Sequence, residues 1–518
     1  MAQPGIFEHW FSLLREQGLQ RQWSAAFVAG VLTLFPLLIA VDLYIDDVER
    51  AMRGTLYWVR VGRPLADLLV ESLNFGRPVT AIAPLYTLVA IALLSAVGVA
   101  CSRAYGIRSP FWTAMASLPL MAQPYALQAM SYGFDSLFMA LALACAIAAA
   151  LLVNRGSGWG SYLAALLLQL VSFNLYQPAA NGFLVMTGCL CVSSALGLLD
   201  RSWQQLSLRL RLVTSAVIYA GGYGLYRLLI ALFYEQRLNG YAVSSAELKP
   251  FDAALPLALV NSASEPLQTL LRDFGHWPLL LPLLLLVFSY AALITQWRSL
   301  RVAFSAMAAL LLVILLAPGG MLLLRDSFVR HPRVLLYFGP LVTSLMLQML
   351  VVSAALKRHL WRLGVLPLIW LMVVFSYSYG HAFAAQVRFE QGRLSRIAAA
   401  ASVLQARAPA QSMRVVMVEG TMPRSPVLLN TTRKFPLIDR LIPPLLDGNQ
   451  TFSFSQLRLH GLDVDKRRQK SLKNELPTGC TPSSEAICTS EFSLQKVGVD
   501  GLVLQLVPDL SQQERPGT

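Results

Sequence analysis

Acidic and basic side chains gather in one short stretch, YIDDVERAMRG, which directly follows a long apolar run. Asp46 and Asp47 are adjacent, and Arg50 follows three to four residues later, within reach if the segment is helical. A carboxylate can take the proton from an attacking hydroxyl group. A guanidinium group can bind phosphate oxygens through two parallel hydrogen bonds. The stretch therefore carries the groups needed to transfer a phosphate-linked substituent to a hydroxyl.

The next residues extend this pattern. Trp58 and the pair Gly62-Arg63 follow at short intervals within DVERAMRGTLYWVRVGRPLADLLVESL, where apolar residues recur at helical spacing with arginines between them. The spacing predicts a helix or a helix pair that lies on a membrane surface rather than crossing it. Such a segment would hold carboxylates and guanidinium groups at the depth of lipid headgroups. The structural alternative is that the aspartate pair is only a charged cap at the membrane exit.

The elements that must position these residues are apolar. Of the 518 residues, 56% are hydrophobic and 14% are charged, whereas about a quarter of the residues of a soluble domain are charged. A spanning helix needs about 20 mostly apolar residues. The chain is therefore predicted to be a polytopic α-helical membrane protein with about 11 spans. The predicted spans are residues 24–42, 79–100, 111–127, 136–153, 161–176, 179–198, 212–234, 278–296, 302–324, 334–355 and 364–380.

The connections between these spans differ in charge. One set is short and rich in arginine, and the positive-inside rule makes it cytoplasmic, together with the N-terminus. The net charge of +14 is thus a topology signal and does not point to nucleic acid. In a bacterium, this predicts a multi-pass inner-membrane protein whose other connections face the periplasm. The predicted periplasmic segments are residues 43–78, 128–135, 176–181, 235–277, 325–333 and everything after 380.

Two predicted periplasmic connections disobey this rule because they carry several arginines. One is the first connection, and the other is RDSFVRHPR, which contains Arg330, His331 and Arg333. Arginines that persist on the translocated side suggest a bound anion. Arg330 and Arg333 are therefore candidates for phosphate contact, with His331 as a hydrogen-bonding neighbour in the sugar or acceptor site. The alternative is that all three are ordinary interfacial residues.

Further candidates lie at the predicted ends of spans. Asp135, beside Tyr132, begins the fourth span, where it would either cap the helix or contact the sugar or acceptor. Tyr176 and Gln177 follow the fifth span and are candidates to line a sugar pocket. Trp58 is a candidate to stack on sugar or lipid. For these aromatic residues the alternative is the ordinary belt at a membrane interface.

The chain changes character after residue 380. Residues 1–380 are predicted to form the membrane domain, and residues 381–518 a small soluble α/β domain on the periplasmic side. Residues 382–407 have the pattern of an amphipathic helix, and MRVVMVEG and VDGLVLQLV that of strands. Cys480 and Cys488 are candidates for a short-loop disulfide in an oxidising compartment. No His, Cys and Asp cluster has the spacing of a metal site.

Four blocks together resemble the bacterial type II O-antigen glucosyltransferases. The first is Asp46-Asp47-x-x-Arg50 with the glycine, tryptophan and Gly-Arg elements that follow it. The second, QPYALQAMSYGFDSLFM, is similar to the second external loop of that family. NLYQPAAN and PRVLLYFG look like later family blocks. The resemblance covers roughly residues 20–380.

This resemblance implies a GT-C architecture and a glycosyltransferase that acts with inversion. The donor would be a polyprenyl-phosphate sugar, with glucose first, and the acceptor a periplasmic glycan such as lipopolysaccharide O-antigen. The resemblance implies that Asp46 is the first candidate for the general base and Asp47 the second. It implies that Arg50 and Arg63 hold either the loop in place or the donor phosphate. No cofactor is expected, although a divalent cation at the aspartates stays open. A separate donor synthase and a flippase would supply the donor.

Other functions stay open from the sequence. A transferase of the same architecture could modify a protein such as a pilin with another sugar. A lipid-linked glycan polymerase or ligase would also use external arginines, and the long connection at residues 235–277 keeps that alternative. A transporter or flippase would place charges inside its spans, where the sequence has almost none.

Overall fold

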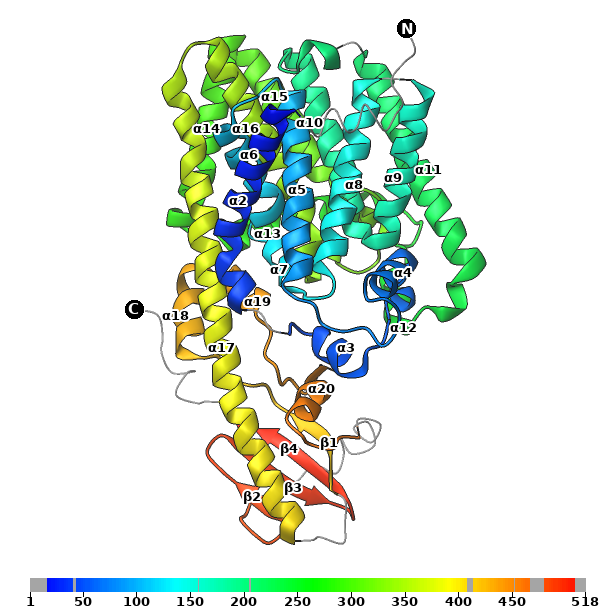
Figure 1. The fold of residues 1–518 in the computed structure, drawn as a ribbon, viewed down its shortest axis with the longest axis vertical. Helices are drawn as coiled ribbons and strands as arrows, with labels where there is room; N and C mark the ends of the chain where they lie inside the picture. Colours follow the sequence, from blue (N-terminus) through cyan, green and yellow to red (C-terminus); the bar gives the residue numbers. More distant parts are fainter. Residues whose placement is uncertain are drawn as a thin grey trace. The chain divides into compact units, whose positions relative to one another are not determined.

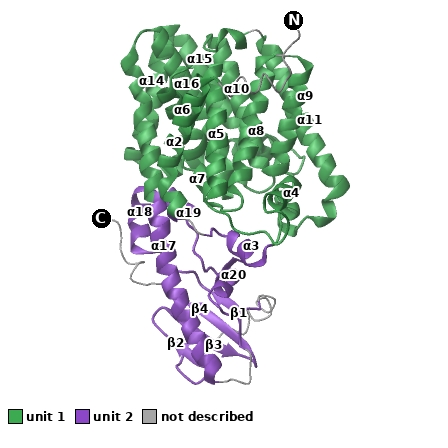
Figure 2. Ribbon diagram, viewed as in Figure 1, with its two compact units in different colours: residues 1–39, 55–378 green, residues 40–54, 379–518 purple. Residues whose placement is uncertain are grey.

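The contacts of the chain divide it into two compact units. The structure is a computed structural model that describes residues 16–40, 43–156, 158–204, 206–407, 413–450, 452–465 and 479–507. Unit 1 comprises residues 1–39 and 55–378, and unit 2 comprises residues 40–54 and 379–518 (Figure 2). The stretch that carries the aspartate pair therefore belongs to unit 2 by its contacts, although the residues on both sides of it belong to unit 1.

Unit 1 is a bundle of helices (Figure 1). Its longer helices are α2 (Gln17–Ala40), α5 (Leu85–Ala104), α8 (Ser136–Arg155), α9 (Trp159–Leu175), α10 (Gly182–Leu196), α11 (Leu208–Phe233), α13 (Leu255–Phe274), α14 (Trp277–Trp297), α15 (Leu300–Leu316) and α16 (Phe338–Ala355). Its shorter helices are α4 (Pro64–Leu73), α6 (Pro110–Ala122), α7 (Ala126–Ser131) and α12 (Gly240–Ser245). Short 3-10 turns connect them, namely η1 (Val59–Val61), η2 (Gln177–Asn181), η3 (Arg201–Trp203), η4 (Glu235–Arg237), η5 (Gly319–Leu323), η6 (Phe328–Arg330), η7 (Pro332–Tyr337) and η8 (His359–Val365).

Apolar helices of membrane length dominate this bundle. Within the described residues, eight helices are long and apolar enough to cross a membrane. Helices α9 and α15 are apolar but shorter, and the predicted span 111–127 corresponds to α6 followed by α7. Each of the predicted spans thus contains helical structure within the described residues. Three of them are shorter than a full crossing, so the number of spans stays a prediction.

Helix α8 lies inside the bundle. It packs against α5, α9 and α10, and nearly all of its side chains are buried. Its sequence is apolar on every side and rich in alanine, which lets neighbouring backbones approach closely. Helices α11 and α14 are instead mostly exposed along their apolar faces, as expected of surfaces that contact lipid. Because α8 is buried on all sides, its first residue is held firmly by the helices around it.

The predicted surface segment is folded into short pieces rather than one helix. In unit 1 it forms η1 and then α4, separated by Gly62 in the left-handed conformation with φ of 73°. The backbone N–H groups of Trp58 and Val59 donate to the Asp67 carboxylate over 2.9 and 3.0 Å. Pro64 occupies the first position of α4, where a missing N–H costs nothing. These contacts fix the turn that presents Arg63.

Unit 2 combines a helix with a four-stranded sheet. Its elements are α3 (Asp47–Arg53), residues 379–407 of α17 (Leu366–Arg407), β1 (Arg414–Glu419), α18 (Pro426–Lys434), α19 (Leu437–Leu441), α20 (Phe452–Leu459), β2 (Ala486–Cys488), β3 (Phe492–Val497) and β4 (Gly501–Leu506). The strand order is β1-β4-β3-β2, with β1 parallel to β4 and the other pairs antiparallel. The predicted helix at 382–407 and the two predicted strands, β1 and β4, are confirmed.

The core of unit 2 joins that helix to the sheet. Leu394, Ile397 and Leu404 of α17 belong to one buried cluster with apolar residues of β1, β3, β4 and α20. Helix α17 has 42 residues, so it is about 63 Å long, roughly twice the hydrocarbon thickness of a bilayer. Its charged second half therefore lies beyond any membrane-spanning part. Cys480 and Cys488 form a disulfide, with their Cα atoms 5.9 Å apart.

Candidate functional site

Asp135 is the central carboxylate of a buried polar group in unit 1. Its Oδ1 accepts a hydrogen bond from Trp58 Nε1 over 2.5 Å and lies 3.8 Å from Arg63 Nη1. Trp58 is fully buried, and Asp135 is 4% exposed. Asp135 stands at the N-cap position of α8, but its side chain makes no capping hydrogen bond. The carboxylate is therefore committed to the indole and the guanidinium, and not to capping the helix.

Arg63 is held from three sides. Its guanidinium lies 4.6 Å from the centroid of the Tyr176 ring, and its Nε donates to Gln177 Oε1 over 3.4 Å. Gln177 Nε2 in turn donates to the Gly62 carbonyl and to the Tyr226 hydroxyl, each over 2.8 Å. Because a carboxylate, a ring and an amide all contact this side chain, Arg63 is preorganised before any ligand binds.

Arg333 reaches the same place from a connection 270 residues further along the chain. Its Nη1 donates to the Tyr132 hydroxyl over 2.7 Å, and its backbone N–H donates to Gln128 Oε1 over 3.0 Å. Burial raises the pKa of Tyr176, while the positive charges of Arg333 and Arg63 and a hydrogen bond with Arg333 oppose that rise. Two guanidinium groups thus converge on one buried phenol.

We call this group the arginine–aromatic cluster. Its members are Trp58, Arg63, Tyr132, Asp135, Tyr176, Gln177 and Arg333. It holds two permanent positive charges against one carboxylate, so its balance favours an anion. Guanidinium groups in a partly dehydrated site bind phosphate oxygens strongly. The aromatic side chains are buried, and Arg63 and Arg333 lie over the rings of Tyr176 and Tyr132, so the rings orient the two guanidinium groups.

Unit 2 carries the aspartate pair on α3. Asp47 is fully buried, its Oδ2 accepts the Tyr44 N–H over 3.3 Å, and its Oδ1 lies 3.5 Å from Arg50 Nη1. The Tyr44 hydroxyl donates to the Leu441 carbonyl over 2.6 Å. Gly54, at φ of 60°, ends the helix with its N–H on the Arg50 carbonyl. Asp47 and Arg50 therefore hold α3 in shape.

Asp46 has a different environment from its neighbour. Its side chain is exposed, and it makes no capping hydrogen bond although it stands at the N-cap position of α3. Among the described residues, no hydrogen bond or ion pair occupies its carboxylate. A carboxylate with open lone pairs can accept a proton, whereas one bound to a guanidinium is a weaker base. The two adjacent aspartates thus differ in their surroundings, since Asp46 is exposed and Asp47 is buried beside Arg50.

The cationic residues of the RDSFVRHPR connection lie in different environments. Arg333 joins the arginine–aromatic cluster, but the Arg330 side chain is 66% exposed and pairs with Asp326 over 3.2 Å. His331 is half-buried at the N-cap position of η7. The structure therefore brings one of the two predicted phosphate ligands of this connection into the cluster and leaves the other in a surface ion pair.

Several residues of the site carried no signal in the sequence. Tyr226 and Gln128 lie inside predicted apolar or loop segments, yet Tyr226 donates to the Gly62 carbonyl over 3.0 Å and Gln128 holds the Arg333 backbone. Asp67 could have been noticed, because a carboxylate three residues after Pro64 interrupts an apolar run. In the described parts of the chain, no three His, Cys, Asp or Glu side chains are grouped to hold a metal ion.

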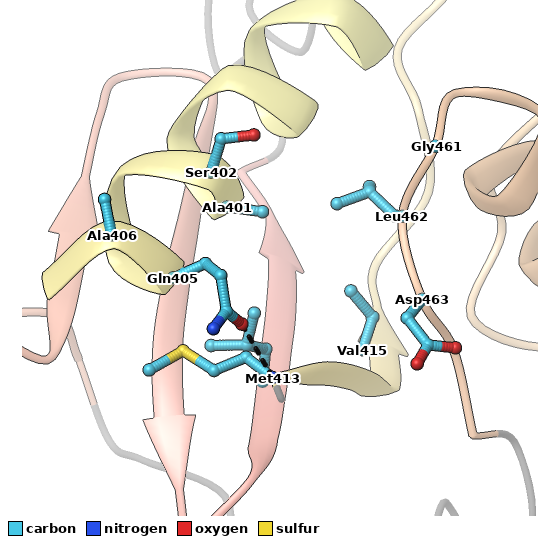
Figure 3. Close-up of a pocket in the computed structure, with 10 residues that line it drawn as sticks. Ala401, Ser402, Gln405, Ala406, Met413, Val415, Gly461, Leu462 and Asp463 are labelled. Carbon is cyan, nitrogen blue, oxygen red and sulfur yellow. Dashed lines mark hydrogen bonds between the residues drawn. The ribbon is translucent and has the colours of Figure 1, made fainter. Parts of the chain in front are cut away.

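A hollow of about 550 Å³ lies elsewhere in unit 2, between the end of α17, β1 and residues 461–463 (Figure 3). Its polar atoms are already engaged. Gln405 Oε1 accepts the Met413 N–H over 2.8 Å, and Asp463 pairs with Arg414 over 3.0 Å. It contains none of the predicted site residues, and it offers no unpaired charge to a ligand.

The fold and the site together define a class of protein. A bundle of apolar, membrane-length helices fits a membrane protein, and the cluster at one end fits a site for an anion. Residues 20–344 match the glucosyl transferase GtrII family, so the chain belongs to this family. The resemblance drawn from the sequence blocks is thereby confirmed.

One curated relative from Salmonella phage P22 is also similar. It is described as an uncharacterized 55.3 kDa protein in the gtrB 5′ region, and it is 28% identical over 157 residues. That match covers 30% of this chain and 32% of the relative. No solved structure matches the chain.

Proposed function

We propose that the protein transfers glucose from a polyprenyl-phosphate donor to a hydroxyl group of a periplasmic glycan such as lipopolysaccharide O-antigen. The observation that carries the proposal is the convergence of Arg63 and Arg333 on Tyr176. A lipid-linked sugar phosphate presents one anionic phosphodiester beside a sugar ring, and two guanidinium groups among aromatic side chains suit that ligand. Membership of a glucosyltransferase family supports glucose as the sugar.

The proposed reaction is a single displacement. The acceptor hydroxyl gives its proton to a carboxylate base while its oxygen forms a bond to the anomeric carbon of the sugar. The bond from that carbon to the phosphate oxygen breaks, and the phosphate leaves with the electron pair. Attack from the face opposite the phosphate inverts the anomeric centre. Because the phosphate is already a good leaving group, no second carboxyl group is needed to protonate it.

The proposal assigns these roles to named residues. Asp46 is the base, because its carboxylate is exposed and unoccupied among the described residues. Asp47 and Arg50 position it by holding α3. Arg63 and Arg333 bind the donor phosphate, and Asp135 orients Arg63 from behind.

The cellular setting belongs to the same proposal. The chain is a GT-C-like protein of the bacterial inner membrane, with a cytoplasmic N-terminus and with the reacting groups and unit 2 on the periplasmic side. A separate synthase makes the donor, and a separate flippase presents it. A protein acceptor such as a pilin would use the same residues.

Transfer by the purified protein tests this proposal. The full chain in detergent would be incubated with polyprenyl-phosphate glucose and an O-antigen acceptor, and the mass of the acceptor would be measured by mass spectrometry. The proposal predicts the addition of one or more hexose units with the lipid-linked donor and none with a nucleotide sugar alone. Hexose addition from the nucleotide sugar would contradict the proposed donor. No addition from any donor would contradict the proposed acceptor.

A further inference from the structure

A second cavity, of about 540 Å³, lies at the opposite end of unit 1 from the arginine–aromatic cluster. It is formed where α5 has ended, α6 begins and α16 ends, and Arg108, Trp112 and Arg362 line it. Helix α16 starts five residues after Arg333 and runs for 18 residues, or about 27 Å, to this cavity. That length is close to the hydrocarbon thickness of a bilayer. The two sites are therefore one membrane thickness apart.

Positive charge dominates the lining of this cavity. Arg108 and Arg362 line it, and none of its lining residues is an Asp or a Glu. Arg362 Nε donates to Ser353 Oγ over 3.2 Å, which orients the guanidinium. One carboxylate lies near the cavity: Asp200 accepts hydrogen bonds from the N–H and Oγ of Ser202, over 3.1 and 2.8 Å, and also interacts electrostatically with Arg108 and Arg201. Two guanidinium groups thus line the cavity against one carboxylate at its edge, so the balance of charge stays positive.

The helix ends at the cavity add to this positive field. Helix α6 begins beside it at Pro110, and the side chain of Ser109 makes no capping hydrogen bond. The first N–H groups of a helix have no acceptor within the helix, and this end carries the positive part of the dipole. At the end of α16, by contrast, the carbonyls of Val352 and Ser353 accept the N–H groups of Leu356 and Arg358, each over 2.9 Å.

The remaining wall is apolar. Leu350, Val351, Ala354 and Ala355 of α16 line the cavity, and Trp112 of α6 lies among them. Phe111, next to Trp112, is more than half exposed. A soluble phosphate would gain nothing from such a wall, whereas the first carbons of an acyl chain would be buried against it.

We propose that this cavity binds the phosphate headgroup of an anionic phospholipid, with the first carbons of its acyl chains against Trp112 and the exposed end of α16 at Ala354 and Ala355. Arg108 and Arg362 would hold the phosphate oxygens, and the start of α6 would add backbone N–H groups. The site is distinct from the one that handles the sugar donor. Basic pockets between membrane helices are suited to such headgroups, and each cationic side chain contributes about fivefold in binding.

Native mass spectrometry of the full chain in detergent tests the proposal. Phosphatidylglycerol, cardiolipin, phosphatidylcholine and inorganic pyrophosphate would be titrated into the wild type and into Arg108→Gln, Arg362→Gln and Arg358→Gln. We expect one anionic lipid to stay bound at collision energies that remove phosphatidylcholine. Arg108→Gln and Arg362→Gln should each weaken it about fivefold. Arg358→Gln is the matched control, because Arg358 is exposed nearby but does not line the cavity.

Three results would overturn the proposal. Equal retention of phosphatidylcholine would show that charge plays no part. An equal loss with Arg358→Gln would show diffuse attraction to a basic surface. Tight binding of pyrophosphate that displaces the lipid would assign the cavity to a soluble ligand. Size-exclusion elution and thermal unfolding of each variant establish that it is folded, and Arg108→Gln alters only an exposed side chain.

Discussion

Trp58 donates its indole N–H to Asp135 Oδ1 over 2.5 Å, although the two residues are 77 positions apart in the sequence. This hydrogen bond ties the turn before Arg63 to the start of α8, which is almost entirely buried in unit 1. A buried carboxylate that loses a donor keeps its desolvation cost, which is about 1–3 kcal/mol or more. The contact is therefore both a structural tie and a way to orient Arg63.

Replacing Trp58 with Phe tests this tie. The ring keeps most of the packing, but Asp135 loses the indole donor. We expect the free energy of unfolding to fall by about 1–3 kcal/mol and the transfer rate to fall with it. Thermal unfolding in detergent and a transfer assay measure the two effects. Trp23→Phe is the control, because Trp23 donates only to a backbone carbonyl at an exposed position. Equal behaviour of the two variants would contradict the role of this bond.

Gly62→Ala should damage the turn that presents Arg63. Gly62 has φ of 73°, and an added Cβ would lie 2.8 Å from the Tyr226 hydroxyl and 3.3 Å from Gln177 Nε2. We expect a loss of about 1–3 kcal/mol in unfolding free energy and weaker donor binding. Gly224→Ala is the matched control, because a Cβ there meets nothing within 4 Å and its helical position favours alanine. A Gly62→Ala protein as stable as this control would contradict the strain.

The two guanidinium groups of the cluster should control donor affinity. Arg63→Gln and Arg333→Gln each remove one charged hydrogen-bonding group, so we expect the KM for the lipid-linked donor to rise about tenfold or more. Arg330→Gln should change it little, since Arg330 is exposed and paired with Asp326. Initial rates at varied donor concentration give the KM values. A larger effect on the KM from Arg330→Gln than from Arg333→Gln would show that the donor phosphate binds near Arg330 and not near Arg333.

Glu390 should make the stability of unit 2 depend on pH. Burial raises the pKa of this carboxyl from 4.5 to about 7, although Gln386, the Leu445 N–H, Arg424 and Arg393 oppose the rise. The folded protein thus binds a proton that the unfolded chain releases. The stability from this proton is fully present below pH 4.5 and is lost as the pH rises to about 7, by about 3 kcal/mol.

Glu390→Gln removes that titration. We expect the variant to lose the decline in thermal stability between pH 4.5 and 7, even if its absolute stability falls because an amide has one acceptor oxygen. The difference in melting temperature between the wild type and the variant at several pH values measures this. An equal pH slope in both proteins would show that another group is responsible.

The periodic elements were readable from the sequence. The helix of unit 2 and the strands β1 and β4 followed from apolar spacing, while β2 has only three residues and β3 is mixed in composition. Arg63 and Arg333 were detectable because arginine on the translocated side of a membrane opposes the topology rule. Their convergence on Tyr176 was not detectable, because it depends on how segments far apart in the chain pack.

The difference between the two aspartates also required the structure. Asp46 and Asp47 are adjacent and chemically identical in the sequence. The packing of Tyr44 against Phe383 and its hydrogen bond to Leu441 bury one carboxylate beside Arg50 and leave the other exposed. No local pattern encodes which of two neighbours will face inward, since a seven-residue helix can be turned either way by its contacts.

The most direct test compares Asp46→Asn with Asp47→Asn in the glucosyl transfer assay. An amide cannot accept the hydroxyl proton, so Asp46→Asn should keep a folded protein with wild-type thermal stability and lower the transfer rate by about 10²–10⁴-fold. Asp47→Asn weakens the ion pair with Arg50 and should lower stability while keeping measurable transfer. Transfer by Asp46→Asn at the wild-type rate would contradict the assignment of Asp46 as the base.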